Sequence, residues 1–252
     1  MIQKKLVSII MPLKNGMPFL RETIESILNQ SYENWELIIV DAISLDGSKE
    51  FIDSLNNNKI KFFSEKLGPG LARNLGIKNS KGEFLAFIDS DDTWDQKKLD
   101  LQINFMNKKK INFTYTNYRW IDHNSNTLGE NKFFLSSISF KEFFSKRVIV
   151  MSSVVIRRDL INKVNLLAYD GYAEDQYFYG KLLELENVAY GLNDSLLSYR
   201  KHSKSRSSDI FANQYAVWNL YRKHFNLNLF QAFIFYISYI FLVAYRRLFR
   251  IN

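Results

Sequence analysis

The first half of the chain alternates short apolar runs with amphipathic stretches. An apolar run between turn residues predicts a buried strand, and apolar residues spaced three and four apart predict a helix. Strands are therefore expected at 6–11, 35–40, 60–63 and 84–88, and helices at 18–29, 47–55, 70–79 and 95–107. Strands that alternate with helices predict βαβ units, a mostly parallel central sheet flanked by helices, and an α/β fold.

The second half of the chain is less regular. Strands are expected at 113–118, 150–156 and 196–199, a hairpin or loop at 119–135, and helices at 174–185 and 209–224. No internal repeat or low-complexity tract interrupts it. The second half therefore adds strands and helices without the strict alternation of the first.

Polar side chains follow three of the predicted strands. Asn15 comes after the first strand, Asp41 after the second, and Asp89 and Asp91 after the fourth. In open parallel sheets, ligands bind beyond the carboxyl ends of the strands. These four residues are therefore the first candidates for a binding site.

The acidic run Asp89-Ser90-Asp91-Asp92 is the strongest chemical signal. Side chains two positions apart in an extended chain share a face, so Asp89 and Asp91 point the same way. Mg²⁺ or Mn²⁺ prefers oxygen ligands, and such an ion clamps a diphosphate and neutralises its charge as it leaves. The alternative is a helix start, with a capping box at 93–96 that accounts for Asp92 and Asp95 but not for Asp89 and Asp91.

Composition narrows the choice further. The 252 residues suit one α/β domain, or a domain with a tail, and the absence of cysteine excludes disulfides, Cys-zinc sites and thiol catalysis. The net charge of +8 lies entirely in residues 199–252, where nine Lys and Arg face the single acid Asp209. A basic tail favours anionic partners such as lipid head groups, diphosphates or nucleic acid. The apolar run 6–11 is too short for a signal peptide, so a cytoplasmic protein is expected.

Four ordered motifs resemble glycosyltransferase family 2: Val7–Gly16 (VSIIMPLKNG), Ile39–Asp41 (IVD), Gly70–Gly76 (GLARNLG) and Phe87–Asp92 (FIDSDD). The resemblance implies a GT-A fold, which is a Rossmann-like nucleotide-binding fold, and an inverting transferase that uses a nucleotide-sugar donor. It implies a transferase domain at 1–205, with a donor-binding half at 1–108 and an acceptor-binding half at 109–205. Residues 206–252 are then a helical, hydrophobic extension.

Site roles follow from the same resemblance. Pro12 and Asn15 are expected to line the nucleotide pocket, and Asp41 to contact the nucleobase. Arg73 is expected to lie beside the base or the phosphate. Asp89 is expected to face the ribose or the sugar, and Asp91 to ligate the metal. Asp175, in the pair Glu174-Asp175, is the expected general base. His202, in Tyr199–His202, is the expected second contact to metal or diphosphate. The alternatives are an acidic helix start at 174–175, a surface arginine at 73 and a structural histidine at 202.

The chain departs from the family pattern in two places. Many members carry Asp-Asp-Gly-Ser-x-Asp after the second strand, whereas this chain has Asp41-Ala42-Ile43-Ser44-Leu45-Asp46. Lys14 stands where an aromatic residue is frequent. Both departures fall in the segments assigned to the nucleobase.

The expected activity is transfer of a sugar, from a UDP-sugar donor, to a hydroxyl of a glycan or lipid-linked acceptor in bacterial surface polysaccharide synthesis. Inversion needs a carboxylate base, positive charge at the leaving diphosphate and exclusion of water. Two alternatives remain: a non-catalytic sugar- or lipid-binding subunit, and a nucleotidyltransferase, which would use a Gly-rich loop that residues 12–16 do not supply. Gly68–Arg73 fails as a dinucleotide fingerprint because Arg73 replaces its third glycine. Nucleic acid is not an expected partner.

Residues 225–245 carry no charge and are flanked by basic residues. The length is close to the minimum for a membrane span, yet Asn228, Gln231, Ser238 and Tyr245 form a weak polar stripe. Three interpretations stay open: a helix in the membrane interface, a helix in a homodimer or core contact, and a true span. The first predicts a peripheral protein on the inner face of the cell membrane.

Overall fold

The computed structural model describes residues 4–146, 148–164, 173–201 and 210–248. In these residues the strands form one sheet in the order β3-β2-β1-β4-β9-β6-β10-β5, with β7 beside β6 and β8 beside β10. They are β1 (Val7–Leu13), β2 (Trp35–Asp41), β3 (Ile60–Ser64), β4 (Phe84–Phe87), β5 (Thr93–Trp94), β6 (Phe113–Ile121), β7 (Thr127–Glu130), β8 (Ser137–Ser139), β9 (Val155–Arg157) and β10 (Val188–Arg200). The predicted α/β fold with a mostly parallel sheet is confirmed.

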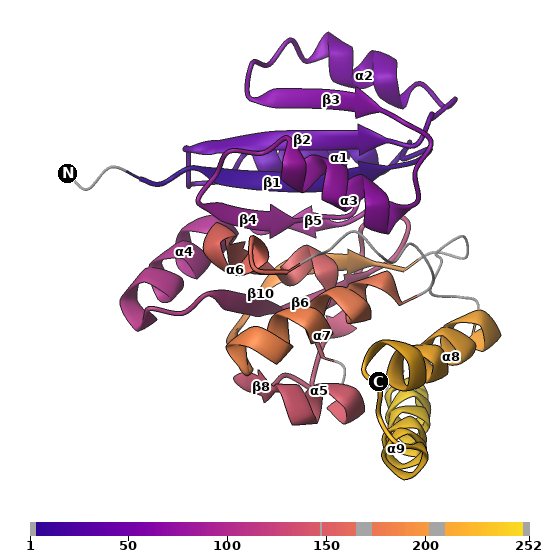
Figure 1. Ribbon diagram of the computed structural model, residues 1–252. Helices are drawn as coiled ribbons and strands as arrows, with labels where there is room; N and C mark the ends of the chain where they lie inside the picture. Colours follow the sequence, from indigo (N-terminus) through magenta and orange to yellow (C-terminus); the bar gives the residue numbers. More distant parts are fainter. Residues whose placement is uncertain (1–3, 147, 165–172, 202–209, 249–252) are drawn as a thin grey trace.

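The described helices follow the strands in sequence. They are α1 (Leu20–Leu28), α2 (Ser48–Ser54), α3 (Pro69–Lys78), α4 (Lys98–Lys109), α5 (Phe140–Lys146), α6 (Arg158–Ile161), α7 (Glu174–Glu186), α8 (Ile210–Asn219) and α9 (Leu229–Leu248), with a 3₁₀ turn η1 (Met151–Ser153) and a π-helical turn η3 (Leu220–His224). Figure 1 shows α8 and α9 at one corner of the molecule, far from α2 and β3.

Alternate residues of the central strands pack into two separate layers. Ile9 and Met11 of β1 join the cluster formed with α1 and α4, whereas Ile10 faces the cluster that contains α5 and α7. Helix α3 lies on the Ile10 side, and a Cβ at Gly76 would come within 2.7 Å of Ile10 Cγ2. The sheet is therefore covered on both faces, as its apolar strands predict.

Two local predictions are wrong. The expected strand at 150–156 is a 3₁₀ turn followed by β9. The strand expected at 196–199 is confirmed, as the end of the longer β10. The expected capping box at 93–96 does not form, because Thr93 and Trp94 pair with β10 and α4 begins only at Lys98, without a side-chain cap. Pairing with a strand more than a hundred residues away outweighs the local helix signal.

The C-terminal extension folds as helices, with η3 ending the helix expected at 209–224. Phe235 of α9 stacks on Phe144 of α5, with ring centroids 5.4 Å apart. No helix in the described part of the chain is long and apolar enough to cross a membrane.

Candidate active site

The carboxyl ends of the parallel strands meet at one edge of the sheet. Strands β1, β2 and β4 run parallel to one another, and β6 runs parallel to β10. Strand β9 is antiparallel to both β4 and β6, so β4 and β6 run in the same direction. The carboxyl ends of β1, β2, β4, β6 and β10 therefore all lie on the same side of the sheet. This edge therefore gathers residues that follow strands from both halves of the chain.

The loops after β1 and β2 hold each other in place. Asn15 has a left-handed φ of 48°; its N–H donates to Ser44 Oγ at 2.7 Å, and its Oδ1 accepts from the Leu45 N–H at 3.0 Å. Asp41 is 2% exposed, and its carboxylate accepts from both the N–H and the hydroxyl of Ser44. Pro12 is half-buried in β1 opposite Val40. Contact of Pro12, Asn15 and Asp41 with a nucleotide stays a prediction.

Arg73 joins the two halves of the site. Its Nη2 donates to Asp89 Oδ1 at 2.7 Å, and its Nη1 donates to Glu174 Oε1 at 3.3 Å. The side chain is 9% exposed, and its Nε has no partner in the described part of the chain. Arg73 is thus no surface arginine: its two ion pairs hold the start of α7 against the end of β4.

The electrostatics of this cluster reflect crowded carboxylates. Burial raises the pKa of Asp89 above its ordinary value, Arg73 opposes that shift, and the charges of Asp91 and Asp175 add to it. Burial alone would lower the pKa of the Arg73 guanidinium, but Asp89 and Glu174 outweigh it and raise that pKa. Negative neighbours that raise the pKa of Asp89 define a place where a cation is stabilised.

Asp92 has a different role from the helix cap that the sequence indicated. It is fully buried, and its Oδ1 accepts the backbone N–H of Arg200 at 2.9 Å. Burial, followed by the charges of Asp91 and Asp89, raises its pKa well above the ordinary value. Asp92 and Arg200 were missed as site residues, although the Tyr199–His202 motif already pointed to that strand end.

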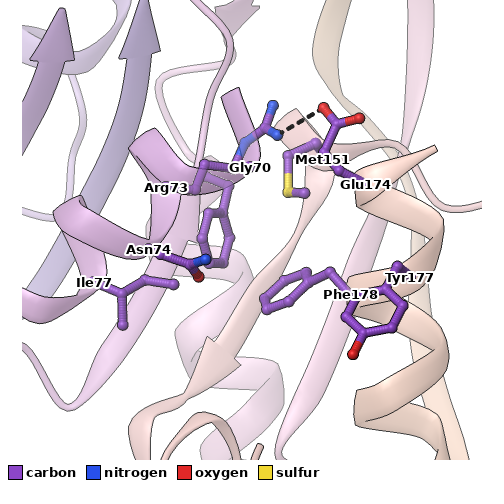
Figure 2. Close-up of a pocket in the computed structure, with 9 residues that line it drawn as sticks. Gly70, Arg73, Asn74, Ile77, Met151, Glu174, Tyr177 and Phe178 are labelled. Carbon is purple, nitrogen blue, oxygen red and sulfur yellow. Dashed lines mark hydrogen bonds and ion pairs between the residues drawn. The ribbon is translucent and has the colours of Figure 1, made fainter. Parts of the chain in front are cut away.

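The expected base, Asp175, lies in the first turn of α7. The residue before this helix, Ala173, has a left-handed φ of 65°, and Asp175 Oδ1 accepts the Gln176 N–H at 2.7 Å. A small pocket lies between α3 and α7, beneath the ion pair of Arg73 and Glu174, with Met151 and Phe178 on its wall (Figure 2). The Asp175 carboxylate lies close enough to Asp89 for its charge to raise the pKa of Asp89, and its role as base stays a prediction.

The donor set fits a metal that the substrate helps to hold. No cluster of three or more His, Asp or Glu able to bind an ion occurs among the described residues, and His202 lies outside them. Mg²⁺ commonly takes one or two carboxylates and completes its shell with water and substrate phosphates. Asp89 and Asp91, two carboxylates close enough for the charge of Asp91 to raise the pKa of Asp89, match that pattern.

Comparisons with known proteins agree with this architecture. The model of Glycosyl transferase family 2 matches residues 8–164. The chain is 33% identical over 220 residues to the Escherichia coli UDP-Glc:alpha-D-GlcNAc-diphosphoundecaprenol beta-1,3-glucosyltransferase WfgD, covering 85% of each chain. It is 28% identical over 240 residues to a Bacillus subtilis protein named Putative teichuronic acid biosynthesis glycosyltransferase TuaG, covering 94% of this chain and 95% of the other.

Solved structures show the same fold. S. aureus TarS 1-349, in complex with UDP-GlcNAc, superposes with a TM-score of 0.73 at 21% identity, covering 96% of this chain and 73% of that one. The mannosyltransferase PcManGT from Pyrobaculum calidifontis, in complex with GDP-Man and Mn2+, gives 0.72 at 14% identity, covering 98% and 76%. At these identities the likeness shows the fold alone.

Proposed function

The chain belongs to glycosyltransferase family 2, and on that premise we propose that it transfers a sugar, with inversion, from a UDP-sugar to a hydroxyl of a glycan or lipid-linked acceptor. It is a glycosyltransferase of the GT-A fold. The observation that carries the proposal is that Asp89, which pairs with Arg73 at the carboxyl edge of the sheet, lies close enough to Asp91 and Asp175 to feel their charges.

The reaction assigns one task to each side of this cluster. Asp175 takes the proton of the acceptor hydroxyl, whose oxygen then bonds to the anomeric carbon from the face opposite the diphosphate. The bond between that carbon and the diphosphate oxygen breaks, and the nucleoside diphosphate leaves with the electron pair. A divalent ion, Mn²⁺ or Mg²⁺, would supply positive charge to the leaving diphosphate, and Asp91 and Asp89 are the described residues that would hold it.

Two similar proteins support a UDP-sugar as the donor. The WfgD name specifies UDP-Glc, and the TarS structure contains UDP-GlcNAc. The same WfgD name specifies a diphosphoundecaprenol acceptor, which makes a lipid-linked acceptor in bacterial surface polysaccharide synthesis the best-supported choice. A GDP-sugar is the competing donor, since PcManGT was solved with GDP-Man.

A panel of UDP- and GDP-sugars, incubated with and without Mn²⁺, tests the activity through nucleotide release. We expect release from one donor class, dependent on the metal, and a fall of roughly 100-fold or more in Asp91→Asn. Asp95→Asn is the matched control, because among the described residues this nearby carboxylate accepts only the Lys97 N–H from its own loop. Full turnover in Asp91→Asn would contradict the metal role, and silence toward every donor would favour a non-catalytic subunit.

We also propose that α9 rests on the inner face of the cell membrane. Its buried side, with Ala232 and Phe235, packs on the core. Its outer face is apolar and consists of Leu229, Phe230, Phe233, Ile234, Ile237, Ile240 and Phe241, each between 37% and 73% exposed. Soluble surfaces rarely leave such a continuous apolar stripe in water.

The basic residues near α9 indicate which partner its outer face binds. Arg222 and Lys223 are exposed just before the helix, and residues 199–252 carry the entire net charge of +8. Apolar side chains next to basic ones match an anionic lipid surface better than a second basic copy of the chain, which repels the first. Membrane docking would also bring the active site to a lipid-linked acceptor.

A further inference from the structure

Arg200 is a buried arginine whose contacts the proposed chemistry leaves unexplained. It ends β10, and its side chain is 0% exposed. Its Nε donates to the carbonyl oxygen of Asp91 at 2.7 Å, while its backbone N–H donates to Asp92 Oδ1 at 2.9 Å. Arg200 therefore binds the acidic run at two points: the main-chain oxygen of Asp91 and the buried carboxylate of Asp92.

The far end of the Arg200 side chain is fixed as firmly. Nη1 donates to the Asp122 carbonyl at 3.0 Å and to Ser125 Oγ at 2.9 Å, both in the turn after β6. Nη2 donates to Glu22 Oε2 of α1 at 2.6 Å, and the guanidinium lies 4.6 Å from the centre of the Phe19 ring. The acidic run is thus tied to elements from both halves of the chain.

We propose that Arg200 is a positioning residue that sets the direction of the Asp91 carboxylate toward the metal and diphosphate. Nε holds the peptide oxygen of Asp91, so the main chain of that residue cannot rotate without breaking a charged, buried hydrogen bond. Arg200 does not touch the substrate. It acts through Asp91, and the inference therefore rests on the proposed role of Asp91.

The guanidinium shape is essential to this arrangement. A planar fork donates in three directions at once, to Asp91, to the turn after β6 and to Glu22, whereas an ammonium is a single point donor. Arg200→Lys keeps the charge but cannot reach all three partners. Substitution of residues that orient metal ligands typically lowers metal affinity by about 10- to 100-fold.

The test measures Mn²⁺-dependent binding of UDP by titration calorimetry, which needs no acceptor or turnover. We expect Arg200→Lys to raise the Mn²⁺ concentration for half-maximal UDP binding by about tenfold or more, while unfolding temperature falls. In an Asp91→Ala background the same substitution should have no further effect on the Mn²⁺ requirement, because its route is through Asp91.

Arg157, whose side chain is 18% exposed, supplies a control for loss of a partly buried arginine. It donates through Nε to the Ile111 carbonyl and through Nη1 to Glu83, and it lies over the Phe84 ring, but at the opposite edge of the sheet. Arg157→Lys should lower stability without changing the Mn²⁺ requirement. If Arg200→Lys does not fold, Glu22→Gln at the exposed end of the network should give a smaller shift in the same direction.

The outcomes separate the inference from the proposed function. An unchanged Mn²⁺ requirement in folded Arg200→Lys, or in folded Glu22→Gln where the first variant is lost, would overturn the positioning role if Asp91→Ala itself still raises that requirement. An equal shift in Arg157→Lys would overturn it as well, since general destabilisation would then account for the effect. If UDP binding by the wild-type protein does not depend on Mn²⁺, the proposed metal role of Asp91 is wrong. The positioning role of Arg200, which depends on it, is then wrong as well.

Discussion

At the scale of single residues, Ile43 shows what a departure from a family pattern does to the backbone. It occupies the position where many members carry glycine, and its φ of 58° lies in the left-handed region. A branched residue there is strained by about 1–2 kcal/mol. The strain sits in the loop that binds Asn15 and encloses Asp41.

Ile43→Gly should therefore stabilise the protein. Relief of the left-handed strain exceeds the extra chain entropy of glycine, about 0.4–1 kcal/mol, and the side chain is 52% exposed, so little apolar contact is lost. We expect a gain of roughly 1 kcal/mol in the free energy of unfolding, measured by urea denaturation. Ile43→Ala retains a Cβ and should gain much less. A loss of stability in the glycine variant would show that the strain is smaller than its φ implies.

Sequence motifs located the site but not its internal contacts. Asp89, Asp91 and Arg73 could be selected from the chain because each stands at a strand or helix end. The ion pair between Arg73 and Glu174 and the grip of Arg200 on Asp91 span about a hundred residues, and no local pattern encodes them. Such contacts depend on strand order, which was not predicted.

At the scale of elements, a capping box forms at the start of helix α5, whereas the sequence predicted one at 93–96. The Ser139 N–H donates to Glu142 Oε2 at 3.0 Å, and the Glu142 N–H donates back to Ser139 Oγ at 3.4 Å. At 93–96 the same kind of pattern failed because Thr93 pairs with β10. A capping box forms where its residues are not paired with a strand. Sequence alone does not show which residues will be paired.

Glu142→Ala should lower stability in a pH-dependent way. Its hydrogen bonds, first with Lys146 and then with Ser139, lower the pKa of Glu142 from 4.5 to about 2. A lowered carboxylate pKa contributes stability above the unfolded value, and that contribution is lost as pH falls from about 4.5 toward 2. The unfolding free energies of wild type and variant should converge over that window. A difference that persists unchanged to pH 2 would exclude the carboxylate as its source.

Lys141→Ala is the control on the same helix, since its first-turn side chain has no part in the cap. The capping loss should also reach α9, because Phe144 of α5 stacks on Phe235. Limited proteolysis of the C-terminal helix is therefore expected to quicken in Glu142→Ala at neutral pH and to stay unchanged in Lys141→Ala.

At the scale of the whole molecule, charge and apolar surface are segregated together. Residues before 199 are neutral overall, while the basic segment that follows also contains the outer face of α9. The charge could be read from the sequence. The direction of the apolar face could not, because the choice between core and solvent depends on how α9 packs against α5 and α8.

Full-length protein should sediment with vesicles that contain phosphatidylglycerol and much less with pure phosphatidylcholine. Phe230→Glu combined with Phe241→Glu should weaken binding by about tenfold or more, since burying one phenylalanine contributes roughly 1.5–3 kcal/mol. The matched control is Leu45→Glu with Leu128→Glu, two exposed leucines elsewhere that are 91% and 54% accessible. High salt should weaken the wild type too, because the basic residues contribute through screened attraction. If the α9 variant instead turns a dimer into a monomer while vesicle binding is unchanged, the outer face pairs with a second copy.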